Sequence, residues 1–333
     1  MKILYSFIAV VALVLLAWLG AGVAQLAFFL GVVIPYAAAI IFIVGVVYRV
    51  LKWARSPVPF RIPTTCGQQK SLPWIKSSYF ESPHNTLGVI GRMALEILTF
   101  RSLFRNTKAE LKEGPRLVYG ADKFLWAGAL AFHYSFLVIF LRHYRFFTEP
   151  VPALVALIQD IDGFFQVGVP ALYVTNIVIV AALGYLFLRR LTNPQVRYIS
   201  LVSDYFALFL LLGVAVSGIL MRYFYKVDIV AVKEMVMGLM SLKPAVPATV
   251  GAILYVHLFL VSVLWAYFPF SKLMHMAGVF LSPTRNLANN SRIVRHINPW
   301  NYPVKVHTYE EWEDEFRDLM KHAHYKPEAF EKE

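Results

Sequence analysis

The chain of 333 residues contains little cysteine and few charged residues. Its single cysteine, Cys66, excludes an internal disulfide, an iron–sulfur cluster held by cysteines, and covalent attachment of c-type haem through C-x-x-C-H. Charged residues make up 16% of the sequence, whereas they make up about 25% of an ordinary soluble domain. Apolar residues account for 58% and aromatic residues for 15%, which also excludes a disordered chain. The composition therefore indicates an integral membrane protein.

The sequence also lacks the motifs of soluble enzymes, namely G-x-G-x-x-G, Walker A, the nucleophile elbow and H-E-x-x-H. Its net charge is +12. In a soluble protein this charge would suggest a nucleic-acid partner, but in a membrane protein it reflects basic cytoplasmic loops. We therefore expect the chain to contact the lipid bilayer and no nucleic acid.

Six apolar segments are long enough to cross a bilayer as helices. They cover residues 3–19, 26–50, 124–141, 167–188, 201–221 and 250–279, with a kink expected at Pro269. The start resembles a signal peptide, but a second apolar segment follows at once, which favours an uncleaved hairpin. We predict an all-α integral membrane protein with six transmembrane helices. It divides into an N-terminal hairpin (1–50), a basic cytoplasmic loop (51–120), a four-helix core (121–281) and a cytoplasmic tail (282–333).

Two shorter helices are expected outside the spans. Residues 87–104 have the apolar spacing of an amphipathic helix at the membrane surface. A short charged helix is expected around residues 309–324. The remainder of the loop and tail is rich in proline and polar residues, with little sustained periodicity.

The positions of lysine and arginine predict the orientation, because cytoplasmic loops are enriched in both. With the N-terminus in the cytoplasm, 26 of the 32 Lys and Arg residues lie inside. The other six are Arg142, Arg145, Arg222, Lys226, Lys233 and Lys243. We therefore expect a multi-pass protein of the cytoplasmic (inner) cell membrane, with both termini cytoplasmic and outer loops near 144–166 and 223–249.

Four of the nine histidines lie in or at the ends of the predicted spans, where an ionisable side chain usually has a function. His133 and His143 are ten residues apart in the third span, and His257 and His275 are eighteen apart in the sixth. Eighteen residues make five helical turns, so the second pair shares one face if the helix is regular. Because these spans run antiparallel, His133 is level with His275 and His143 with His257.

Two such pairs provide what two bis-histidine b haems require, since each iron takes one imidazole from either side of the porphyrin. We predict that His133 and His275 ligate the inner haem iron and that His143 and His257 ligate the outer one. The alternative is that the four histidines form hydrogen bonds to neighbouring helices. The other five histidines, His84, His296, His307, His322 and His324, lie in polar segments where ligation is not expected.

At these residues the sequence resembles the membrane cytochromes b of the respiratory nitrate reductase gamma-subunit family. That family carries four haem-ligating histidines with spacings of ten and eighteen, and both spacings occur here. The resemblance covers roughly residues 120–285. It implies a di-haem helical bundle that transfers electrons within a membrane.

Other segments resemble DsrM-type subunits, the cytochromes b of DsrMKJOP complexes in sulfate reducers. These segments are the N-terminal hairpin, the loop sequence from Pro63 to Gln69, and the tail sequence from Asn298 to Asn301. The resemblance implies menaquinol oxidation and electron delivery to a cytoplasmic iron–sulfur subunit resembling DsrK, which is related to heterodisulfide reductase, in sulfite or sulfate respiration. The other DsrMKJOP subunits would be further partners. The chain would then be the quinol-oxidising subunit of an oxidoreductase and incomplete as an enzyme by itself.

A quinol site is expected in the outer loops. Arg142 and Arg145 flank His143, Asp160 and Asp162 are candidate proton acceptors, and Met235, Met237 and Met240 are candidates for its apolar wall. The alternative is that the arginines anchor the span at the lipid headgroups and that the methionines only pack.

The cytoplasmic segments provide a candidate interface for the iron–sulfur partner. Residues 50–120 and 282–333 contain tryptophan and tyrosine residues, which are enriched at the hot spots of protein interfaces: Trp53, Trp74, Tyr79, Trp300, Tyr302 and Trp312. Alternatively, the basic residues hold this surface against anionic headgroups. Two other functions remain open on the sequence: a cytochrome b anchor of another respiratory enzyme (nitrate reductase, hydrogenase or formate dehydrogenase), and a haem-free transporter or assembly protein.

Overall fold

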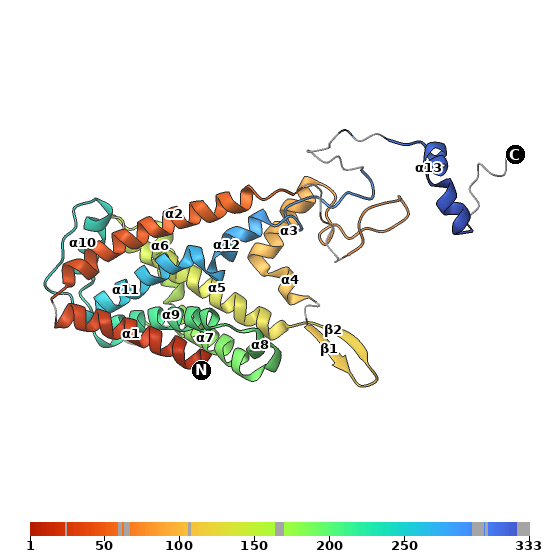
Figure 1. Ribbon diagram of the computed structural model, residues 1–333. Helices are drawn as coiled ribbons and strands as arrows, with labels where there is room; N and C mark the ends of the chain where they lie inside the picture. The colour runs from red at the N-terminus through yellow and green to blue at the C-terminus, as the bar shows by residue number, and fades with distance from the viewer. Residues whose placement is uncertain are drawn as a thin grey trace.

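The fold is a bundle of long apolar helices, seen in a computed structural model that describes residues 1–23, 25–58, 62, 67–105, 108–163, 170–294, 303 and 306–324. Within these residues six helices are long and apolar enough to cross a membrane, as the sequence predicts. They lie side by side in Figure 1. The chain is therefore a mostly helical, multi-pass membrane protein.

The six helices lie close to the predicted spans. They are α1 (Lys2–Gly22), the π-helical η1 (Phe29–Val33) with α2 (Ile34–Ala54), α5 (Lys123–His143), α7 (Val174–Thr192), α9 (Val202–Ile219) with the π-helical η3 (Leu220–Phe224), and α11 (Ala252–Tyr267). The largest difference is in the sixth, whose helix ends at Tyr267 although the span was expected to continue to residue 279. The fourth helix begins at Val174, whereas its span was expected to begin at residue 167.

Shorter elements connect these spans. They are α3 (Thr86–Thr99), α4 (Arg101–Phe104), η2 (Tyr144–Phe146), α6 (Ala153–Asp162), α8 (Pro194–Ile199) and α10 (Ile229–Met240), followed by α13 (Tyr309–His322) in the tail. The predicted helix at 87–104 is thus two helices, because Phe100 adopts a left-handed conformation with φ of 49° between them.

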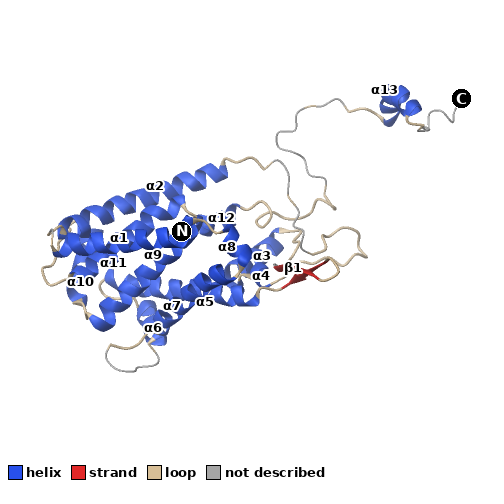
Figure 2. Ribbon diagram, turned by 60° about the horizontal axis from the view of Figure 1, so that its bottom comes forward, coloured by secondary structure: helices blue, strands red, loops and turns tan. Residues whose placement is uncertain are grey.

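One hairpin departs from the all-helical prediction. Strands β1 (Lys108–Lys112) and β2 (Arg116–Gly120) pair antiparallel, with Lys108 opposite Gly120 and Lys112 opposite Arg116. Gly114 occupies the turn with φ of +78°, a conformation that glycine adopts without strain. Figure 2 shows this hairpin at one end of the bundle. Each strand has only five residues and is almost fully exposed, so no buried face gives it a recognisable sequence pattern.

The sixth span is not one regular helix, which corrects the five-turn argument. After α11 the chain forms 3₁₀ turns at Phe268–Phe270 and Lys272–Met274, separated by an extended Ser271 with ψ of 176°. The single turn α12 (His275–Gly278) and the 3₁₀ turn η6 (Val279–Leu281) follow. Pro269 cannot donate a backbone hydrogen bond to a continuing helix. His257 and His275 therefore lie on separate segments, and their positions result from packing and not from one helical face.

The N-terminal hairpin packs directly on the core. α1 lies against α9 and α11, and α2 lies against α11, while α5 packs on α7. Gly45 allows α2 to approach the turn that follows α11, because a Cβ atom on Gly45 would lie 2.7 Å from Cβ of Pro269 in that turn. α11 is the most enclosed of the six spans, and it carries His257.

Candidate functional site

The structure brings the four histidines of the spans together as two pairs. The ring centroids of His133 and His275 are 5.9 Å apart, and those of His143 and His257 are 6.3 Å apart. The ring planes of His133 and His275 are nearly perpendicular at 86°, whereas those of His143 and His257 are nearly parallel at 15°. The first pair joins α5 to α12, and the second joins α5 to α11.

Three of these rings are oriented by a backbone carbonyl. Nδ1 of His133 donates to Ala129 O at 2.7 Å, Nδ1 of His143 to Ile139 O at 2.7 Å, and Nδ1 of His275 to Lys272 O at 2.9 Å. A carbonyl oxygen only accepts, so the proton of each neutral ring is assigned to Nδ1. Nε2 then carries the lone pair that a metal ion binds.

His257 is oriented by a side chain from α9 in place of a carbonyl. Its Nδ1 lies 2.9 Å from the Ser217 hydroxyl oxygen, and that hydroxyl donates its own proton to Val214 O at 3.0 Å. Ser217 is therefore the acceptor for His257, and all four histidines share one tautomer. Gly218 makes room for this ring, since a Cβ there would lie 3.3 Å from Cε1 of His257.

The donor set fits a haem better than a bare metal ion. Among the described residues, no group of three or more His, Cys, Asp or Glu side chains is placed to hold a metal. Two opposed imidazoles at metal bonds of about 2 Å have ring centroids about 6 Å apart, as both pairs here have. A porphyrin supplies four further nitrogen ligands, so two histidines complete the iron.

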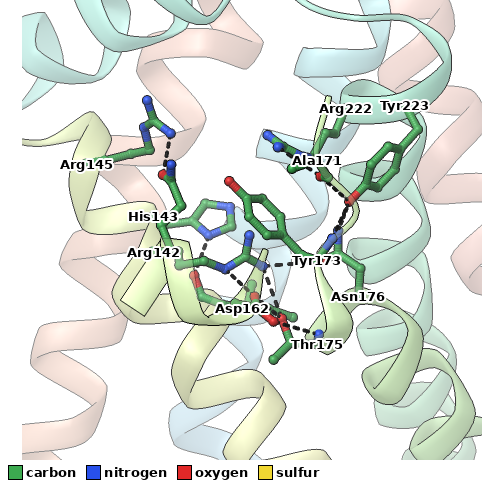
Figure 3. A network of polar contacts seen from close by, with 12 residues as sticks. Arg142, His143, Arg145, Asp162, Ala171, Tyr173, Thr175, Asn176, Arg222 and Tyr223 are labelled. Carbon is green, nitrogen blue, oxygen red and sulfur yellow. Dashed lines mark hydrogen bonds and ion pairs between the residues drawn. The ribbon is translucent and has the colours of Figure 1, made fainter. Parts of the chain in front are cut away.

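A network of polar side chains lies beside His143, as Figure 3 shows. Arg142 Nε forms an ion pair with Asp162 Oδ2 at 2.9 Å. Thr175 donates to the same carboxylate from its backbone N at 2.9 Å and from its hydroxyl at 2.6 Å. Arg142 Nη2 also donates to Asn176 Oδ1 at 3.3 Å. The network thus connects the C-terminal end of α5 to α6 and to the start of α7.

Two guanidinium groups stack on one tyrosine in this network. Cζ of Arg142 lies 3.7 Å and Cζ of Arg222 lies 4.0 Å from the ring centroid of Tyr173, which is buried. Tyr223 closes the arrangement by accepting from the backbone N of Tyr173 at 3.0 Å. Cation–π contacts strengthen when water is excluded, so this buried stack holds two positive charges close to His143.

The candidate quinol-site residues do not all join this network. Arg142 and Asp162 are buried in it, and Arg145 donates to Gln159 on α6, but Asp160 is exposed on the surface of that helix. The three methionines do not form one wall. Met235 is buried in the core, where its Cε lies 2.6 Å from a Cβ placed on Gly31, whereas Met240 is exposed.

The loop between α2 and α5 is hydrogen-bonded to the tail at the His133 end of the bundle. Asn289 N donates to Pro83 O at 2.6 Å, Gln69 Nε2 donates to the Ser291 hydroxyl at 3.0 Å, and Arg92 Nη1 donates to Thr284 O at 3.2 Å. Of the proposed interface aromatics, Trp74, Tyr79 and Trp312 are exposed. Cys66, Trp300 and Tyr302 lie outside the described residues.

Some site residues had no clear sequence signal. Ser217 and Gly218 are small residues within an apolar span, where a serine is usually a helix–helix contact. Thr175, Asn176 and Tyr173 lie at the start of α7, and only the fold brings them to Arg142. Phe100, whose ring centroid lies 4.9 Å from that of His133, belongs to the loop before α5.

Comparison with known proteins adds two findings. Residues 104–296, which include all four paired histidines, match the family described as nitrate reductase gamma subunit. The chain is also similar to two proteins named Hdr-like menaquinol oxidoreductase cytochrome b-like subunit. The one from Archaeoglobus fulgidus is 49% identical over 81% of this chain and 83% of its own length. The one from Archaeoglobus profundus is 40% identical over 80% and 81%.

Proposed function

Since this chain belongs to the nitrate reductase gamma-subunit family, we propose that it is the haem-binding cytochrome b subunit of a menaquinol oxidoreductase. The single observation that carries this proposal is the pair of opposed histidine sets, each with Nδ1 anchored and Nε2 left for a metal. The names of the relatives from Archaeoglobus support the quinol and the cytochrome b parts.

His133 and His275 would hold one b haem, and His143 and His257 would hold the other. A bound b haem supplies a one-electron carrier at each position. The chain's own contribution is to fix the four rings through Ala129, Ile139, Lys272 and Ser217 and to space the two sites along α5. Ten helical residues separate His133 from His143 by about 15 Å, so the two sites together span about half of a bilayer.

Menaquinol would be oxidised at the His143 end, close to the network of Arg142, Asp162 and Arg222. Arg142, which is buried, and Arg222, which is half-buried, would bind the oxygen atoms of the quinol, while carboxylates on α6 would accept its protons. Asp160 is the more accessible carboxylate, and Asp162 is already bonded to Thr175 and Arg142. We therefore assign proton release to Asp160 and positioning to Asp162.

The distribution of lysine and arginine supports cytoplasmic termini in an inner cell membrane. In that orientation the His133 end faces the cytoplasm, and so do the loop between α2 and α5 and the tail. Electrons would leave there to an iron–sulfur subunit of the Hdr type, docked on exposed aromatics such as Trp74 and Tyr79. A DsrK-like partner, the other DsrMKJOP subunits and a role in sulfite or sulfate respiration belong to this proposal as its most specific form.

Spectroscopy of the purified chain tests the proposal. We expect a dithionite-reduced b-type spectrum and a pyridine haemochrome content of two haems per chain. His133→Ala and His275→Ala should each remove the same haem, and His143→Ala and His257→Ala the other. His84→Ala is the matched control, because His84 lies in the polar loop and contacts Lys70. A full-length preparation without haem, or equal haem loss in the control, would contradict the proposal.

A further inference from the structure

Helix α3 has its polar and apolar faces reversed relative to a surface helix of a soluble protein. Its charged residues Arg92 and Glu96 are buried against the protein. Between its two terminal threonines, which are also exposed, its exposed residues are all apolar and form one stripe: Leu87, Ile90, Ala94, Ile97 and Leu98. Leu87 is 75% exposed and Leu98 is 59% exposed. A row of large apolar side chains with this spacing indicates a non-aqueous contact.

The buried polar contacts fix which face of α3 points outward. Arg92 donates to the carbonyl of Thr284, and Glu96 forms an ion pair with Arg285 at 3.8 Å. Glu96 also accepts hydrogen bonds from the backbone N and the hydroxyl of Ser102. Because these partners belong to the tail and to α4, α3 cannot turn its apolar stripe inward without breaking them.

The C-terminal end of α3 lies at the level of a membrane span. Leu98 O accepts from the Tyr134 hydroxyl at 2.7 Å, and Thr99 O accepts from Trp126 Nε1 at 2.7 Å. His133, whose ring meets Phe100, is ten residues from the start of α5. Trp126 is three residues and Tyr134 eleven residues from the start of α5, so this end of α3 lies about 5–15 Å inside the span.

These two bonds are what a helix end requires in hydrocarbon. The last carbonyls of a helix lack helical partners and usually bind water. In a membrane each of them needs a donor from the protein. Here two of them receive donors from α5, which also exposes apolar side chains such as Phe124 and Leu137. The C-terminal end of α3 therefore has the backbone partners that a lipid environment demands.

We propose that α3 is a half-membrane helix whose apolar stripe contacts acyl chains. It enters the bilayer from the end of the bundle that carries His133 and His275, and its C-terminal end is the deeper one. A protein partner would reach the polar N-terminal end, near Asn85, but not the part of the stripe near the C-terminal end, which is bonded to α5. The inference does not depend on bound haem, because it rests on contacts of the polypeptide alone.

Nitroxide labels at single cysteines test this placement in full-length protein in lipid nanodiscs. Cys66→Ser removes the native thiol, and Leu87, Ile90, Ala94, Ile97 and Leu98 are then replaced by cysteine one at a time. Power saturation compares collisions with oxygen, which partitions into lipid, and with water-soluble nickel-EDDA. Leu111→Cys in the hairpin β1–β2 is the matched control, because Leu111 is a leucine that is 74% exposed.

The ratio of oxygen to nickel accessibility should be higher at Leu98 than at Leu111 and should rise from Leu87 to Leu98. A label at Leu98 as accessible to nickel as the one at Leu111 would overturn the proposal. Labels that are shielded from both reagents would overturn it too, because they would indicate a protein-covered face. Each of the five variants changes one side chain. If one variant fails to fold, the other four still measure how the accessibility ratio changes along α3.

Discussion

The buried ion pair between Arg142 and Asp162 gives a quantitative prediction for Asp162→Asn. Its Nε and Oδ2 atoms are 2.9 Å apart, and both side chains are buried. With an effective dielectric constant of 20, two unit charges at this distance attract by about 6 kcal/mol. Most of this attraction only offsets the cost of burying the charges. Removing one partner leaves the other charge uncompensated, and this typically costs about 3–5 kcal/mol.

Asp162→Asn should therefore lower the free energy of unfolding by about 3 kcal/mol or more at neutral pH. The amide that replaces the carboxylate retains an oxygen for Thr175 but has no charge to pair with Arg142. The double variant Arg142→Met, Asp162→Asn should lose much less than the sum of the two single changes, because no unpaired charge remains.

Denaturant unfolding in one detergent, followed by near-UV circular dichroism, would measure this cycle. Asp160→Asn is the matched control on the same helix, since Asp160 is exposed, and it should change stability by no more than about 0.5 kcal/mol. The reasoning would be refuted if Asp162→Asn cost as little as the control, or if the two single effects were additive.

Three further predictions concern the histidine pairs and the tail. Ser217→Ala removes the acceptor of His257 Nδ1 and should weaken haem retention at that pair alone by about 10–100-fold in a haem-release assay; Ser262→Ala, whose hydroxyl bonds only within α11, should not. Electron paramagnetic resonance of the haem-loaded protein should show two different low-spin signals. The near-perpendicular imidazole planes of His133 and His275 would leave two iron d orbitals almost degenerate, whereas the near-parallel planes of His143 and His257 would split them. A single shared signal would contradict this ring geometry. Truncation after Val294 should release an iron–sulfur partner and retain both haems. Truncation after Pro283 should in addition make the loop sensitive to protease, because the loop loses its hydrogen bonds to Thr284 and Ser291. A partner that stays bound after either truncation would exclude the tail from the interface.

The sequence by itself determined the six spans and the separation of His133 and His143 along one of them. A bilayer imposes a minimum length of apolar helix, and a helix converts residue number into depth, so His133 and His143 had to lie at two levels of one span. Helix caps also depend on residues that are close in sequence. At the start of α13, for example, the Thr308 hydroxyl accepts a hydrogen bond from the backbone N of Glu311. Such features depend on neighbours within a few residues.

Only the tertiary structure decided how distant residues meet. The break at Ser271 places His275 on a separate segment from His257, and the folded chain still brings His275 into ring contact with His133. Contacts across the bundle join Arg142 to Asp162 and Ser217 to His257. The apolar spacing of α3 was visible in the sequence, but its outward face was set by Thr284 and Arg285, nearly two hundred residues away. Hydrophobic periodicity in the sequence shows that a helix has a polar and an apolar face. Which of these faces points into the protein depends on polar partners that only the folded chain brings close.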